Sequence, residues 1–297
     1  MSTLVSTRSR GTDQRASIAT LALIEVRRYA RHPLFLVGLA LMALAAFVPL
    51  SRDDIPGSPV DLAFYPVFFI GTFGVIVAYR LAKSIDVAGE VADAAPVHRA
   101  DRTAALCLAT LFPAAVGAVA TVVMIAVGLV TWSNTTLWDT GIDSVTLVAA
   151  LLAGVVACAG GPLFGIVVAR WTNFPGAGLV AVVALVAWTL SGTVGLAMAE
   201  PSRLSALLHL QTPWVGWTSS DGPGMQQWLA EGSVPGQLAY AITLCLLGAT
   251  FAIVHDAQGE QRRRLWRLFA VLAAVAVLLL GASVLGEPVR QPLNLVS

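Results

Sequence analysis

The chain has 297 residues, of which 57% are hydrophobic and only 12% are charged, and its formal net charge at pH 7 is +1. Soluble domains usually carry about 25% charged residues, so this composition argues against a soluble protein and predicts a membrane protein. The three cysteines each lie inside an apolar run, with no CxxC pair and no zinc-ligand spacing. They are therefore expected to be small buried side chains rather than disulfide or metal ligands.

Seven apolar runs are long enough to predict transmembrane helices, since about 20 helical residues cross the hydrocarbon core of a bilayer. In chain order they are 34–50, 62–79, 103–130, 145–169, 176–199, 237–254 and 268–286. We therefore expect an all-α polytopic membrane protein with six transmembrane helices if the last run does not cross, or seven if it does. An amphipathic helix, described below, is expected before the first span.

The basic residues lie almost entirely on one side of these spans. Fifteen of the 18 Lys and Arg residues precede the first span or follow the second, fourth or sixth span. Because cytoplasmic loops carry an excess of Lys and Arg, the N-terminus is predicted to be cytoplasmic and the chain integral to the cell (plasma) membrane. The chain then divides into a cytoplasmic N-terminus (1–33), a transmembrane domain (34–286) and a short C-terminal tail (287–297).

The segment before the first span reads IEVRRYARHP, residues 24–33. On a helical wheel of residues 16–31, most apolar side chains share one side, the arginines share the other, and one glutamate falls inside the apolar arc. This pattern is typical of a helix that lies in the membrane interface, and Pro33 would end it. It is either a positively charged anchor only or an "elbow" helix that also supports a cytoplasmic partner. Its charged residues are Glu25, Arg27, Arg28 and Arg31.

The second span contains the aromatic stretch FYPVFFIGTFG. Four of its side chains, including that of Thr72, fall on one helical face. This face either packs against protein and lipid or lines a path for a hydrophobic substrate, and the same two interpretations apply to one tryptophan in the fifth span. The candidate substrate-path residues are Tyr65, Phe69, Phe73 and Trp188. Pro66 and Pro113 predict bends in the second and third spans.

The fourth span carries Ala153, Ala157, Gly161 and Gly165 at intervals of four residues. Small residues at this spacing let two helices approach closely. The stripe predicts a helix contact, either within one subunit or between two subunits.

The loop after the second span is RLAKSIDVAGEVADAAPVHRADR, residues 80–102. Asp86, Glu90 and Asp93 would line one face of a short helix that Pro96 ends. The segment is either a solvated loop or a lever that moves both adjoining spans. In the long loop 200–235, the stretches RLSALLHL and MQQWLAEG each predict a short helix.

The predicted spans contain no acidic or basic residues that could relay protons or catalyse a reaction. They contain no Asp, Glu, Lys, Arg or His, and the chain has no P-loop, HExxH or GxSxG motif. An ion-coupled carrier usually places ionisable groups at membrane depth, so a proton relay is not indicated. A membrane-embedded transferase or protease would need polar catalytic groups there as well. If the chain moves a solute, the energy must come from elsewhere, and a separate ATPase subunit is the simplest source.

Four stretches resemble those of ABC-2 type transporter permeases, the membrane subunits of one class of ABC exporters. They are LALIEVRRYARHPLF for the N-terminal elbow, GEVADAAPVHRADR for the coupling-helix region, FGIVVARWTNFPGAGLVAVVALV for the inner turn between spans four and five, and GQLAYAITLCLLGATFAIV for the start of the last span. The likeness covers most of the chain. It departs from the usual six-span plan by the seventh predicted span.

The resemblance implies a transport subunit without enzymatic activity or a cofactor of its own. Two permease subunits, identical or different, would form the pathway, and a P-loop ATPase partner would bind ATP and Mg²⁺. Membrane lipid would surround the complex, and no nucleic acid would bind. The implied ATPase-subunit contact is Asp86, Glu90, Asp93 and Arg99. The alternative is a non-transporting membrane anchor, assembly or sensor subunit, which would share the topology and the lack of catalytic motifs.

Overall fold

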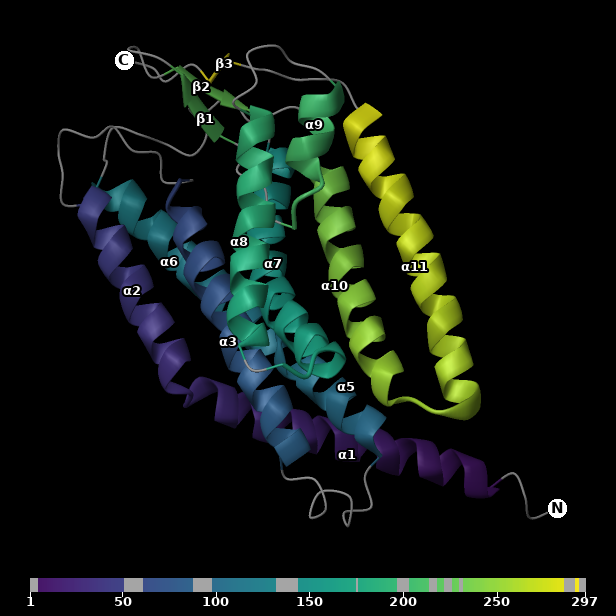
Figure 1. Cartoon of the computed structure of the whole chain (residues 1–297). Helices are drawn as coiled ribbons and strands as arrows, with labels where there is room; N and C mark the ends of the chain where they lie inside the picture. Colours follow the sequence, from purple (N-terminus) through teal and green to yellow (C-terminus); the bar gives the residue numbers. More distant parts are fainter. Residues whose placement is uncertain are drawn as a thin grey trace.

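The computed structural model describes residues 5–50, 61–87, 98–131, 144–174, 176–196, 203–213, 218–221, 226–229, 232–285 and 292–293. This part of the chain is predominantly helical, as the sequence predicts (Figure 1). Its helices are α1 (Val5–Ala30), α2 (Pro33–Leu50), η1 (Asp61–Ala63), α3 (Phe64–Val87), α5 (Arg99–Ala109), α6 (Leu111–Thr131), α7 (Ser144–Trp171), α8 (Ala177–Leu196), α9 (Arg203–Leu210), α10 (Val234–Asp256) and α11 (Gly259–Leu285). Its strands are β1 (Thr218–Asp221), β2 (Gln226–Leu229) and β3 (Pro292–Leu293).

Five helical segments of the described chain are long and apolar enough to cross a membrane. They are α3, α5 together with α6, α7, α10 and α11. A sixth candidate is the pair formed by Ser17–Ala30 and Pro33–Val48, which is bent by 57°. The apolar part of α8, Ala177–Gly192, is shorter. These helices confirm a polytopic membrane protein, while the total of six to seven spans stays a prediction.

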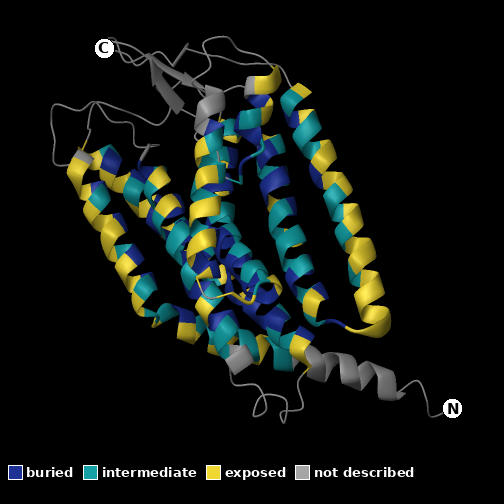
Figure 2. Cartoon of the chain, viewed as in Figure 1, coloured by how far each residue is buried: buried dark blue, intermediate teal, exposed yellow. Residues whose placement is uncertain are grey.

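The outer faces of several helices are apolar and uncovered. Phe47 of α2, Val122 of α6, Val183 of α8 and Leu278 of α11 are each more than 60% exposed. Exposed positions run along α2 and α11 for most of their length (Figure 2). Soluble proteins rarely expose contiguous apolar surface of this kind, whereas lipid tails cover it without cost.

Helix α1 lies across one end of the bundle, and α2 then runs beside α3 (Figure 1). The chain turns at Pro33, which is the first residue of α2 and needs no helical hydrogen-bond donor there. Near the end of α1, Tyr29 is buried and Arg27 is exposed, and Arg31, just after the helix, is exposed as well. The interfacial elbow helix stays a prediction. We call this end of the bundle, where α3 and α10 finish and α5 begins, the α1 end.

The closest helix contact is between α3 and α7. A Cβ atom placed on Gly161 would overlap the carbonyl oxygen of Gly71, and one placed on Gly165 would overlap that of Val75. The small-residue stripe of α7 therefore serves packing within one chain, which was one of its two interpretations. Helix α7 continues through Pro162 to Trp171.

The two predicted proline bends have different outcomes. The third span is divided at Thr110 into α5 and α6, because Pro113 cannot donate a hydrogen bond to the carbonyl of Ala109. Pro66, in contrast, lies in the first turn of α3, where a proline replaces no helical hydrogen bond. The bend predicted at Pro66 was therefore wrong.

At the opposite end from α1, the stretch RLSALLHL forms α9, as predicted. The stretch MQQWLAEG was predicted to be helical, but Gln226–Leu229 is strand β2, so this prediction was wrong. The strand pairs antiparallel with β1 through Ser219 and Trp228, and with β3 through Trp228 and Pro292. The neighbouring strand β1 and the distant strand β3 pair with the main-chain groups of β2, which a short isolated helix would leave open.

Candidate functional site

A half-open cavity of about 420 Å³ lies between α3, α7, α8 and α10. Its walls include Phe68 of α3, Phe164 of α7, Trp188 of α8, and Leu244 and Phe251 of α10. Among the residues that the structure describes, no charged side chain contributes to this lining. A cavity of 300–1,000 Å³ is typical of sites for small molecules, so the size suits a drug-sized apolar molecule or a single hydrocarbon chain.

Small side chains create the space. Ala157, Gly160 and Gly161 of α7 and Gly248 of α10 all lie on the cavity wall. Bulky residues from α8 and α10 border the space that these positions leave unfilled. The small residues of α7 thus have two roles, since Gly161 both contacts α3 and borders the cavity.

The predicted substrate-path residues separate into two groups. Trp188 borders the cavity, together with Thr72 of the predicted aromatic face. Tyr65 and Phe69 instead pack against the main hydrophobic core, and Phe73 lies against Gly38 of α2. These three are not among the residues that line the cavity within the described chain.

The aromatic residues of α3 that do border the cavity are Phe64 and Phe68. They are stacked on each other, with ring centroids 5.5 Å apart. Their spacing of four residues is the same as that of Tyr65 and Phe69, one residue earlier in register. Periodicity alone gives two equivalent aromatic stripes, so the sequence could not select the one that faces the cavity.

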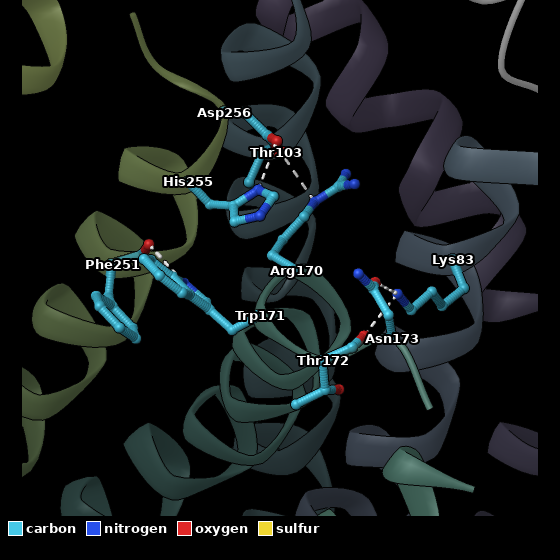
Figure 3. Close-up of polar contacts among 9 residues, drawn as sticks. All are labelled: Lys83, Thr103, Arg170, Trp171, Thr172, Asn173, Phe251, His255 and Asp256. Carbon is cyan, nitrogen blue, oxygen red and sulfur yellow. Dashed lines mark hydrogen bonds and ion pairs between the residues drawn. The ribbon is translucent and has the colours of Figure 1, made fainter. Parts of the chain in front are cut away.

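A cluster of polar side chains lies at the α1 end of the bundle (Figure 3), and those of Arg170, Asp256 and Thr103 are buried while that of His255 is 41% exposed. The Nε atom of Arg170 lies 3.3 Å from Oδ2 of Asp256. The hydroxyl of Thr103 donates a hydrogen bond to the same carboxylate oxygen. Nδ1 of His255 lies 2.9 Å from Oδ1 of Asp256. We call these four residues the Asp256 cluster.

The three buried members of the Asp256 cluster come from three different helices. The side chains of Arg170 and Asp256 are only 5% and 8% exposed, and they come from the last turns of α7 and α10. Thr103 comes from the first half of α5. Removing one partner of a buried ion pair typically costs about 3–5 kcal/mol, because the charge of the other partner is then left uncompensated.

Sequence reasoning missed this cluster. Arg170 was counted only as one basic residue in a loop, and Asp256 was given no role. Both lie just beyond the predicted spans 145–169 and 237–254, but α7 and α10 extend far enough to include them. No local signal pairs the two, since they are far apart in the sequence and meet only when α7 and α10 pack.

An aromatic stack connects the Asp256 cluster to the cavity. The indole of Trp171 lies parallel to the ring of Phe251, with centroids 4.4 Å apart and an interplanar angle of 5°. Its Nε1 donates a hydrogen bond of 3.2 Å to the carbonyl oxygen of Phe251. His255 meets the same indole edge-on. Phe251 and Phe269 border the cavity, so side chains are in contact from the cavity wall to Asp256.

Further contacts link α1 and α7 to the end of α3. Arg28 makes an ion pair of 2.9 Å with Glu25, and its Nη2 donates a hydrogen bond to Ser84 of α3. The Lys83 ammonium donates to the carbonyl oxygen of Thr172 at 2.8 Å and to Oδ1 of Asn173 at 3.2 Å, just past the end of α7. A displacement of the end of α3 would therefore also displace α1 and the end of α7, through these hydrogen bonds.

The predicted ATPase-subunit contact is only partly within the described chain. Arg99 is exposed and begins α5. Asp86 lies in the last turn of α3, and its side chain is outside the described set. Glu90 and Asp93 fall outside the described residues. Among the residues that the structure describes, no group of three His, Cys, Asp or Glu side chains could hold a metal ion.

Comparison of the chain with family models, with curated proteins and with solved structures found no match.

Proposed function

We propose that the chain is the permease subunit of an ATP-driven ABC exporter, which forms the substrate pathway as a dimer and is powered by a separate ATPase subunit. The observation that carries the proposal is the apolar cavity whose walls include α3, α7 and α10, three helices of membrane-spanning length, together with the exposed arginines at the α1 end. The four stretches that resemble ABC-2 type permeases add the direction of transport and the energy source.

The cavity is the candidate substrate path. Apolar side chains dominate its wall, and the polar groups are few: the hydroxyls of Thr72 and Thr189 and the indole of Trp188. Such a lining favours a hydrophobic molecule with few hydrogen-bonding groups, since each unpaired polar group would cost free energy on entry. A charged solute would lose its hydration without gaining a counter-ion.

The α1 end supplies the candidate partner surface, which we place on the cytoplasmic side. Arg27 of α1 and Arg31, directly after α1, are exposed and would face lipid headgroups or a partner. The hydrogen bond from Arg28 to Ser84 ties α1 to α3, whose last turn leads into the loop with Glu90. A subunit that pushes on this loop would move α3 and α5 together.

A mild-detergent pull-down of the tagged chain from its native host tests the proposal. We expect the chain to recover a protein with a P-loop ATPase motif, and we expect Glu90→Lys to lose it. Glu260→Lys is the matched control, because Glu260 is 60% exposed at the α1 end of α11 and the charge change is the same.

Three outcomes are informative. An ATPase that binds the parent and the control but not Glu90→Lys supports both the function and the docking site. An ATPase that binds all three variants keeps the function and rejects the site. No ATPase with any variant, under conditions that preserve known transporter complexes, rejects the exporter and favours the membrane anchor or sensor subunit.

A further inference from the structure

We propose that the Asp256 cluster is the lock of an inner gate: it holds the ends of α5, α7 and α10 together and thereby keeps the cavity closed toward the α1 end. The inference rests on the proposed function only in treating the cavity as a transport path. Its physical content, a polar lock that controls water access to an apolar cavity, is tested without a substrate or an ATPase.

The lock joins the same two helices twice. On α7, neighbouring residues Arg170 and Trp171 contact α10 by an ion pair and by a ring stack, respectively. On α10, their partners Asp256 and Phe251 lie about one and a half turns apart. The ends of α7 and α10 cannot separate without breaking both contacts.

The ring stack is the floor of the cavity. Phe251 and Phe269 mark the α1 end of the cavity lining, and Trp171 covers Phe251 on the side of the Asp256 cluster. If α7 and α10 moved apart at this end, the indole would leave Phe251 and the cavity would open toward the α1 end. In this proposal the stacked rings of Trp171 and Phe251 block the cavity at the α1 end, and the ion pair between Arg170 and Asp256 keeps the two rings in contact.

An ion pair at this depth is suited to a reversible lock. While the α1 end is closed, Arg170 and Asp256 are buried, and the Asp256 carboxylate is stabilised by Arg170 and by the hydroxyl of Thr103. Because the pair lies in the last turns of its helices, opening would let water reach both charges. Hydration of the two charges would then offset much of the lost electrostatic attraction, so the open and closed arrangements would differ little in free energy.

Thr103 connects the lock to the region that would contact the ATPase subunit. It lies on α5, the helix that follows the loop with the implied ATPase contact, and Arg99 begins the same helix. A displacement of α5 along its axis would withdraw the Thr103 hydroxyl from Oδ2 of Asp256. Loss of this hydrogen bond would make the closed arrangement of α5 and α10 less stable.

The native residue Cys245 is a reporter of the gate. It borders the cavity, whereas the two other cysteines of the chain, Cys107 and Cys158, are buried in the core. In a Cys107→Ala/Cys158→Ala background the only remaining thiol is in the cavity. The experiment measures the initial rate at which a positively charged, membrane-impermeant methanethiosulfonate labels this thiol in the full-length protein, added from the α1 side of sealed vesicles.

Asp256→Asn removes the carboxylate charge 3.3 Å from Arg170 and is expected to raise the labelling rate about tenfold or more. Thr103→Val removes one hydrogen bond and keeps the ion pair, and is expected to raise it about fivefold. Glu260→Gln is the matched control, because it neutralises one partner of an exposed pair with Arg264 and should leave the rate unchanged.

Parent-level labelling in both Asp256→Asn and Thr103→Val would overturn the lock. If Asp256→Asn does not yield a monodisperse protein, Thr103→Val decides alone, since a valine of equal shape leaves packing intact. A raised rate in the Glu260→Gln control would also overturn it, because the effect would then not belong to the cluster. The pull-down described above decides the exporter separately, so either proposal can fail while the other stands.

Discussion

Gly165 of α7 lies directly against the main-chain carbonyl of Val75 in α3, with no room for a Cβ atom between them. We therefore predict that Gly165→Ala destabilises the protein by about 1–3 kcal/mol or more, because the obstacle is main chain and cannot rotate away. Thermal unfolding in detergent, followed by tryptophan fluorescence, measures the effect. Gly281→Ala in α11 is the control, since its Cβ would meet no atom within 4 Å. Equal melting of the two variants would contradict the close contact.

Tyr29 packs its ring edge-on against Phe35 and Phe112, with centroids 5.1 and 6.1 Å away. Its buried hydroxyl has no hydrogen-bond partner among the described residues. We predict that Tyr29→Phe is neutral or stabilises by up to about 1 kcal/mol, because a buried group without a partner is removed. Tyr29→Ala should cost about 3–5 kcal/mol, because the ring contacts are lost and a cavity remains.

The same unfolding assay compares the two tyrosine variants. A Tyr29→Phe protein that is as unstable as Tyr29→Ala would show that the hydroxyl, rather than the ring, holds α1 in place.

Lys83 connects the end of α3 to the residues just after α7 through hydrogen bonds to Thr172 and Asn173. We predict that Lys83→Met costs about 1.5–3 kcal/mol, since a hydrogen bond from a charged donor is worth more than a neutral one. Arg80→Met is the control, because Arg80 lies one turn earlier on α3 and is exposed. Hydrogen exchange should also quicken at the end of α7 in the Lys83 variant alone. An unchanged exchange rate there would show that the contact does not hold this turn.

His209 of α9 is 3% exposed, and its Nδ1 lies 3.3 Å from the carbonyl oxygen of Gly192. Burial lowers the pKa of His209 from 6.5 to about 4, and the contact with Gly192 offsets part of this shift. Between these two pKa values the unfolded chain binds a proton that the folded chain does not. Stability from this group is therefore full above pH 6.5 and falls by about 1.4 kcal/mol per pH unit toward pH 4.

We expect His209→Gln to flatten the fall of the melting temperature between pH 7 and pH 5. His98→Gln, which changes an exposed histidine, should melt with the pH dependence of the parent. Identical pH profiles for the parent and His209→Gln would show that His209 is not neutral and buried in the folded protein.

The positions of most helices could be predicted from the sequence, because apolar runs and prolines act within a single segment of the chain. The apolar runs that predicted spans at 145–169 and 237–254 lie inside α7 and α10, and Pro33 begins α2 where a proline is best tolerated. The stretch RLSALLHL carries a helical pattern that neighbouring residues alone can satisfy, and it forms α9. The stretch around Gln226–Leu229 shows the limit, since strands β1 and β3 replace its local preference.

The sequence by itself determined that the chain is helical, apolar and divided into segments of membrane-spanning length, because hydrophobic length and proline positions act within one segment. Only the tertiary structure decided that Phe68 rather than Phe69 faces the cavity, and that Arg170 meets Asp256. Those outcomes depend on how each helix is rotated and shifted against its neighbours. Rotation and register are set by contacts such as Gly165 against Val75, which join residues that no local pattern connects.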